Sequence, residues 1–191
     1  MNLRLFIAID IPEEIKRQLG DLIDILQKHD ANVTWVVRDN LHLTLKFLGA
    51  TPETLLSAIR DRLARVFSLC APFLIRVRSA GAFPNERHPR VLWVGIENSD
   101  HLEKLRNDIE DALFSIGIQR DTKSFHPHLT LGRVRNQRGM LMLLKDFLSA
   151  RNKHFGDVLV DRIHLMKSDL KPGGPLYTCL HSFPLGGAAT A

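Results

Sequence analysis

Cysteine is nearly absent from this chain, and long hydrophobic runs are missing altogether. The 191 residues include two cysteines, Cys70 and Cys179, which lie far apart and belong to no CxxC pair. They cannot form a disulfide framework, and they indicate a reducing compartment. The first apolar run ends at Asp10, which makes it too short for a signal peptide, and no stretch approaches the roughly 20 apolar residues of a membrane span. We therefore expect a cytoplasmic protein that contacts no membrane.

The chain also lacks low-complexity linkers and a strong excess of either charge. With 25% charged and 45% hydrophobic residues, its composition is that of an ordinary globular protein and excludes a disordered or fibrous chain. We expect one domain over residues 1–185, present as a monomer, and a disordered glycine- and alanine-rich tail over residues 186–191. The net charge of +5 mildly favours an anionic partner such as nucleic acid, although it also serves solubility.

Hydrophobic periodicity predicts about four helices and seven or eight strands. Runs of adjacent strands favour a mainly antiparallel sheet and an α+β fold. Thr51 and Pro52 are expected to open the second helix, and Ser99 with Asp100 to cap the third. The predicted strands cover residues 4–11, 33–37, 41–48, 73–80, 91–96, 128–134, 158–166 and 176–183, and the helices cover about 12–26, 51–66, 99–116 and 140–148.

One tetrapeptide, His-Leu-Thr-Leu, occurs twice, at residues 42–45 and 128–131. Chance gives a second copy with a probability on the order of 1% at this composition. Both copies lie in predicted strands and helical patterns follow each, which indicates an internal duplication. A histidine in a single apolar strand is usually a packing residue, but the matched pair favours a functional site.

Alternation along a strand places residues i and i+2 on one face. His42 and Thr44 therefore share a face, as do His128 and Thr130, while the leucines point to the core. If the two halves are related by a pseudo-twofold axis, these faces line one groove. Lys46 is expected to extend the first His-Thr face, whereas strict alternation puts Arg133 on the face opposite His128 unless the strand ends, twists or bulges there.

Two imidazoles with adjacent hydroxyls suit the cleavage of a phosphodiester. One histidine takes the proton from the attacking oxygen, and the other gives a proton to the leaving oxygen. Threonine hydroxyls and nearby cations hold the non-bridging oxygens. No cofactor and no metal is expected, although His42, His126 and His128 leave a zinc site open as an alternative.

The other aromatic residues and histidines are interpreted as structural. Phe6, Trp35 and Trp93 are predicted to pack in the core and not to stack on a nucleic-acid base. The remaining histidines have no repeat partner and are assigned to the surface or to packing: His29, His88, His101, His154, His164 and His181.

These motifs resemble the two-histidine (HxTx) phosphoesterases, and within them the RNA 2′,3′-cyclic phosphodiesterases, also called 2′-5′ RNA ligases. The resemblance rests on RLFIAIDIPEEIK, NLHLTLKFLG and FHPHLTLGRVR, and it spans about residues 4–180. It implies a bilobal fold with two antiparallel sheets facing a central cleft, helices outside and no metal. It further implies that His42 and His128 are catalytic, His42 as the acid and His128 as the base, and that Thr44, Thr130 and Arg133 bind the phosphate.

The implied reaction opens a terminal 2′,3′-cyclic phosphate of RNA to a 2′-phosphate, and the reverse-type reaction joins RNA ends through a 2′-5′ bond. The expected partners are thus RNA ends or cyclic nucleotides. Two alternatives stay open at this stage. One is a cyclic phosphodiesterase that acts on small nucleotide metabolites, and the other is a non-catalytic module that binds RNA ends.

Overall fold

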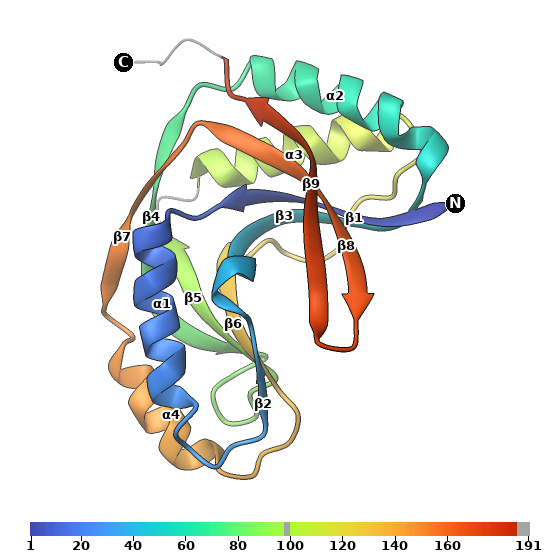
Figure 1. Ribbon diagram of the computed structural model, residues 1–191. Helices are drawn as coiled ribbons and strands as arrows, with labels where there is room; N and C mark the ends of the chain where they lie inside the picture. The colour runs from blue at the N-terminus through green and yellow to red at the C-terminus, as the bar shows by residue number, and fades with distance from the viewer. Residues whose placement is uncertain (98–99, 187–191) are drawn as a thin grey trace.

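The computed structural model describes residues 1–97 and 100–186, and this part of the chain forms four α-helices and nine β-strands (Figure 1). The helices are α1 (Glu13–Leu26), α2 (Leu56–Ser68), α3 (Asp100–Phe114) and α4 (Met140–Ser149). The strands are β1 (Asn2–Asp10), β2 (Val33–Trp35), β3 (His42–Pro52), β4 (Phe73–Phe83), β5 (Val91–Glu97), β6 (His128–Val134), β7 (His154–Val160), β8 (Arg162–Lys171) and β9 (Gly174–Pro184). The expected α+β class with four helices is confirmed.

All strand pairs of the sheet are antiparallel, in the order β7-β4-β5-β6-β3-β1-β8-β9, with β2 added beside β6. We call β3, β1, β8 and β9 the first lobe, and β6, β5, β4, β7 and β2 the second lobe. The lobes meet where Leu43 pairs with Leu129. The resemblance implied two antiparallel sheets facing a cleft, and in the structure the strands of both lobes belong to one curled sheet joined at this pair.

The chain exchanges strands between the lobes. Strand β4 follows β3 and α2 along the chain but lies beside β5 in the second lobe, and β8 follows β7 but lies beside β1 in the first. Helices α2 and α3 pack together behind the first lobe, and α1 and α4 pack behind the second (Figure 1). This exchange ties the lobes together far more strongly than the single β3–β6 contact could.

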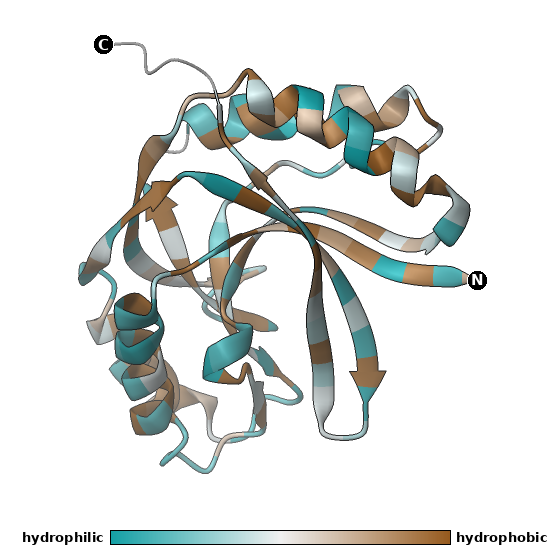
Figure 2. Cartoon of the chain, turned by 45° about the horizontal axis from the view of Figure 1, so that its top comes forward, coloured by the Kyte–Doolittle hydropathy of each residue, from teal (hydrophilic) through white to brown (hydrophobic). Residues whose placement is uncertain are grey.

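Apolar side chains fill the space between the helices and the sheet. Ile15, Leu19 and Leu26 are buried on one side of α1, as their helical spacing predicts, while hydrophilic residues cover most of its outward face (Figure 2). The leucines of both repeats are 0–2% exposed and belong to the same core. None of the described helices is long and apolar enough to cross a membrane.

Three boundaries differ from the predicted ones. The predicted strand over residues 158–166 is two strands in different lobes, with Asp161 between them, because the apolar alternation continues across the break. Thr51 and Pro52 still belong to β3, since they pair with Leu3 and Asn2 of β1, and the helical segment begins after them with a 3₁₀ turn over Glu53–Leu55 that leads into α2. Of the tail expected to be disordered, Gly186 donates a backbone hydrogen bond to Phe67 (3.2 Å). Residues 187–191, like the predicted cap Ser99, lie outside the described residues.

One buried ion pair fixes β3 against α3. The Lys46 ammonium donates to the Glu110 carboxylate at 2.7 Å and to the carbonyl of Gln119 at 3.0 Å, and both charged side chains are at most 5% exposed. The Glu110 carboxylate also accepts from the backbone N–H of Asp121 (3.3 Å). Lys46 thereby connects the first repeat to the segment that leads into the second.

We expect Glu110→Ala to lower the free energy of unfolding by about 3–5 kcal/mol, because it leaves a buried ammonium without its counter-ion. Urea denaturation monitored by circular dichroism measures this loss. Glu14→Ala is the matched control, since it removes the carboxylate of an exposed pair with Arg17 that water screens. If both variants lowered the free energy of unfolding equally little, the buried pair would stabilise the fold no more than the exposed pair does.

Candidate active site

The two repeats form strands with the same burial and the same irregularity. Residues 42–48 and 128–134 have identical alternation, in which the fourth and fifth positions are both buried. The cause is a β-bulge in each strand: Leu45 is the extra residue opposite β1, and Leu131 is the extra residue opposite β5. A bulge inserts one residue into the alternation and so reverses the faces of the residues that follow.

The bulges change where two basic residues point. Lys46 was predicted to extend the His-Thr face, and this prediction is wrong. Its side chain turns into the core toward Glu110. In the second repeat Gly132 takes the inward position, and Arg133 is exposed on the face of His128 and Thr130. Phe47, which is 62% exposed, occupies the corresponding position of the first repeat. The strand therefore bulges as the placement of Arg133 on the face of His128 requires.

The pairing of Leu43 with Leu129 sets the two His-Thr faces side by side. Its antiparallel register places His42 across from Thr130 and Thr44 across from His128. In regular pairing, facing residues stand about 4.5–5.5 Å apart at Cβ and diagonal residues about 7–8 Å. The two imidazoles therefore lie on one diagonal of this group of four residues, and the two threonine hydroxyls lie on the other. We call this surface, which the helices leave uncovered, the open face.

Each histidine is held in the same way by its own chain. Nδ1 of His42 lies 2.7 Å from the carbonyl oxygen of Asn40, and Nδ1 of His128 lies 2.6 Å from that of His126. A carbonyl oxygen only accepts, so Nδ1 carries the proton and donates it. This tautomer leaves Nε2 of both rings free to accept a proton when neutral and to donate one when charged.

Aromatic rings flank both histidines. Phe6 and Tyr177 lie 5.0 and 5.3 Å from the ring centre of His42, and Phe83 and Trp93 lie 5.0 and 6.4 Å from that of His128. Phe6 is buried, as predicted. Trp35 packs against the core. Trp93 differs from its prediction, since it pairs with Thr130 on the open face and is partly exposed there.

The flat placement of Trp93 depends on a glycine. A side chain at Gly81, its cross-strand partner, would overlap the indole ring. Glycine at this position lets the indole ring lie directly on the backbone of β4. The ring then forms a flat apolar surface beside His128.

Burial lowers the pKa of both histidines below the ordinary value, and the neighbouring charges differ between them. For His42, the hydrogen bond to Asn40 and the carboxylate of Asp10 act to raise the pKa, and Lys16 acts to lower it. For His128, the hydrogen bond to the His126 carbonyl raises the pKa, whereas Arg133 and His126 lower it. The two imidazoles are thus equally oriented but differ in their electrostatic surroundings.

Tyr177 packs against Phe6 and His42 on the open face. Burial raises the pKa of its phenol, and the cations Arg133 and Arg4 oppose that shift, so the phenol lies within the field of the second lobe's arginine. It reaches His42 from the β8–β9 hairpin, whose tip is tied to the segment before β3 by a hydrogen bond from Asn40 Nδ2 to the Pro175 carbonyl (3.0 Å). Sequence reasoning missed Tyr177, Phe83 and Asp10, because only strand pairing brings them to the histidines.

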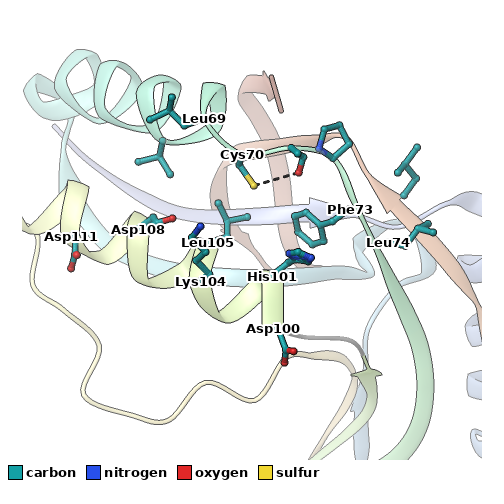
Figure 3. A pocket seen from close by; sticks show the side chains of 14 residues that line it. Leu69, Cys70, Phe73, Leu74, Asp100, His101, Lys104, Leu105, Asp108 and Asp111 are labelled. Atoms are coloured by element: carbon teal, nitrogen blue, oxygen red, sulfur yellow. Dashed lines mark hydrogen bonds between the residues drawn. The ribbon is translucent and has the colours of Figure 1, made fainter. Parts of the chain in front are cut away.

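A cavity of about 1100 Å³ lies elsewhere, between the C-terminal end of α2, α3 and the start of β4. Figure 3 shows His101 and Lys104 on α3 facing Cys70 and Phe73 across it. It holds a single histidine and lies on the helical side of the sheet, so it does not contain the two histidines of the repeats. Among residues 1–97 and 100–186, no group of three histidine, cysteine or acidic side chains is placed to hold a metal ion.

A curled antiparallel sheet that presents two His-x-Thr strands on one open face defines the class of two-histidine phosphoesterases. The chain belongs to the 2′-5′ RNA ligase superfamily, whose family profile matches residues 11–172.

Relatives extend over nearly the whole chain. The RNA 2′,3′-cyclic phosphodiesterase of Methanothermobacter thermautotrophicus is 35% identical, with 97% of this chain and all of the relative covered. That of Thermotoga maritima is 37% identical, with 94% of each chain covered. Among solved structures, TT0787 of Thermus thermophilus matches with a TM-score of 0.83 at 32% identity over 98% of this chain and all of the other. LigT of E. coli, solved with 3′-AMP, matches with a TM-score of 0.77 at 28% identity over 97% and 99%.

We expect His42 and His128 to titrate below 6.5 in the folded protein, the ordinary value for histidine, because burial disfavours the charged ring. Folding stability should accordingly fall as the pH drops below about 6.5, since the unfolded chain then binds protons that the folded one does not. NMR titration of the two rings in the native protein and in urea measures the difference. Equal pKa values of the rings in the native and unfolded states would contradict the expected effect of burial.

Proposed function

We propose that this protein is a metal-independent RNA 2′,3′-cyclic phosphodiesterase. The observation that carries the proposal is the diagonal placement of His42 and His128, each with Nδ1 bound to a carbonyl and Nε2 free. In-line displacement at phosphorus needs a base on the attacking side and an acid on the leaving side. The relatives that bear this name cover the same length of chain.

In the proposed step, His128 Nε2 takes a proton from water, and the water oxygen attacks phosphorus. The bond from phosphorus to O3′ breaks as His42, in its protonated form, gives its Nε2 proton to that oxygen. The product is a 2′-phosphate with a free 3′-hydroxyl. Arg133 beside His128 favours the neutral ring that a base requires, which supports this order of roles.

We propose that Thr44, Thr130 and Arg133 bind the non-bridging oxygens. The two threonines flank the diagonal between the histidines, and the second bulge brings Arg133 to their face. Hydroxyl and guanidinium donors aimed at a phosphoryl group stabilise the charge that develops in its transition state. The same groups would serve the joining of RNA ends through a 2′-5′ bond. We further propose that residues 1–185 act as one catalytic domain, as a monomer in the cytoplasm.

We expect His42→Ala and His128→Ala each to reduce kcat on RNA ending in a 2′,3′-cyclic phosphate by about 10²- to 10⁴-fold, because each removes a proton-transfer group. His88→Ala, in the exposed segment between β4 and β5, is the control and should keep its activity. Thr44→Val and Thr130→Val should act more mildly and weaken phosphate binding. Steady-state kcat is measured with EDTA present, single-turnover assays check that chemistry limits the rate, and the native fold of each variant is checked by circular dichroism.

Retention of more than about a tenth of the rate by either histidine variant would refute the paired scheme. Loss of wild-type activity in EDTA, restored by zinc, would favour the alternative site at His126 and His128. The same assay with small cyclic nucleotides, in place of RNA, decides between an RNA end and a metabolite as the substrate. Tight binding of RNA ends without turnover would indicate the non-catalytic module.

The position of the acid predicts which oxygen leaves. With His42 on the O3′ side, the product should be a 2′-phosphate with a free 3′-hydroxyl. Phosphorus NMR distinguishes the two monoesters, and digestion with a 3′-phosphate-specific phosphatase gives an independent readout. A predominantly 3′-phosphate product would overturn the proposed orientation even if both histidines proved essential.

A further inference from the structure

The internal duplication allows each neighbour of His42 to be compared with its counterpart at His128. The rings have the same tautomer, fixed by the same carbonyl contact, and they precede the same bulge. Two corresponding positions on the open face differ in charge. The residue five positions after the histidine is Phe47 in one repeat and Arg133 in the other, and the cross-strand partner is Asp10 in one and Gly95 in the other.

The pairing of Asp10 with His42 in the β1–β3 register places both side chains on one face, at the end of each strand. Directly paired residues have Cβ atoms about 4.5–5.5 Å apart, so the carboxylate lies within the range in which it favours a protonated imidazole. Gly95 provides nothing of the kind at His128.

A second contact fixes the position of the carboxylate. The Asp10 side chain is 63% exposed, but its Oδ1 lies 2.8 Å from the ammonium of Lys16, whose own side chain is 11% exposed on α1. The lysine side chain is largely buried, so its ammonium offers the exposed carboxylate a salt-bridge partner of restricted position on the side of His42. Among the residues that the structure describes, no such salt bridge lies beside His128, whose pKa is lowered by the nearby Arg133 and His126.

We infer that Asp10 is a positioning residue that keeps His42 as the proton donor and thereby sets the order of the two histidines. In this scheme Asp10 contacts neither the attacking water nor the phosphate, and it acts on the reaction only through His42. The inference rests on the proposed function for its kinetic consequence, but its effect on the His42 ring can be measured without substrate.

The sign of the kinetic effect follows from the active form, in which His42 is protonated and His128 is neutral. Above the pKa values of both rings, the rate is proportional to the fraction of protonated His42. Below both values, it is proportional to the fraction of neutral His128. Removal of the Asp10 charge destabilises protonated His42 and should therefore reduce kcat/KM on the alkaline side alone.

Other titratable groups near His42 must be separated from this effect. Tyr177 reaches it from β9 and Lys16 from α1, and Asp10 also acts on the pKa values of His164 on β8 and Cys179 on β9. Assigned NMR signals distinguish His42 from His164. The ring of His42 therefore provides the direct readout and the pH profile the functional one.

The experiment compares Asp10→Asn with two variants on α1. In Asp10→Asn the His42 ring should titrate at lower pH, and kcat/KM on the alkaline side should fall about two- to fivefold, the range of a half-exposed charge pair, with the acidic side unchanged. Lys16→Met removes a cation that opposes protonation of His42 together with the salt bridge that holds Asp10. The two losses act on the ring in opposite directions, so this variant should move its titration less than Asp10→Asn does. Asp24→Asn removes an exposed carboxylate of the same helix and should change neither readout.

A uniform loss of activity at all pH values with an unchanged His42 titration would reduce Asp10 to a structural role and overturn the inference. An increase of kcat/KM on the acidic side would overturn it as well, because it would make His42 the base. If the wild-type protein turned over no cyclic phosphate, the proposed function would fail, while the NMR titration of Asp10→Asn would still decide whether the carboxylate controls the ring.

Discussion

The pairing of Leu43 with Leu129 is the contact on which the rest of the site depends. It aligns two strands of the same sequence so that each histidine lies across from the other strand's threonine, and it does so while both pairs of leucines stay buried in the core. A slip by one residue would turn every histidine and threonine into the apolar interior. Burial of the leucines therefore enforces the register that brings the two imidazoles to one face.

The bulges after each threonine extend this arrangement by one further residue. Strict alternation would bury Arg133 and expose Lys46, and the structure does the reverse. Burial of the Lys46 charge is compensated, because the ammonium binds a carboxylate and a carbonyl in the interior. The second repeat places Gly132 at this position and needs no counter-ion. The same local distortion thus stabilises the first half of the protein and supplies a surface cation in the second.

The sequence predicts the repeats, the strands that carry them, the helices and the α+β class, because these follow from short-range periodicity. It misplaces the break at Asp161, since apolar alternation continues through it, and it cannot anticipate the exchange of β4 and β8 between the lobes. The residues that depend on this exchange or on cross-strand pairing are those that sequence reasoning missed. Phe83 reaches His128 from β4, Tyr177 reaches His42 from β9, and Asp10 faces His42 from β1.

Duplication supplies two equivalent groups, whereas displacement at phosphorus requires two different ones. Nothing within the repeated tetrapeptides distinguishes the histidines, since their tautomer, burial and bulge agree. The difference arises one strand away, where β1 provides Asp10 and β5 provides Gly95, and two residues past the bulge, where Phe47 corresponds to Arg133. Charges at these positions act on the proton affinity of each ring without altering its orientation. The division of labour between the two halves is therefore encoded outside the motif, at positions that could change during evolution while both histidines remained in place.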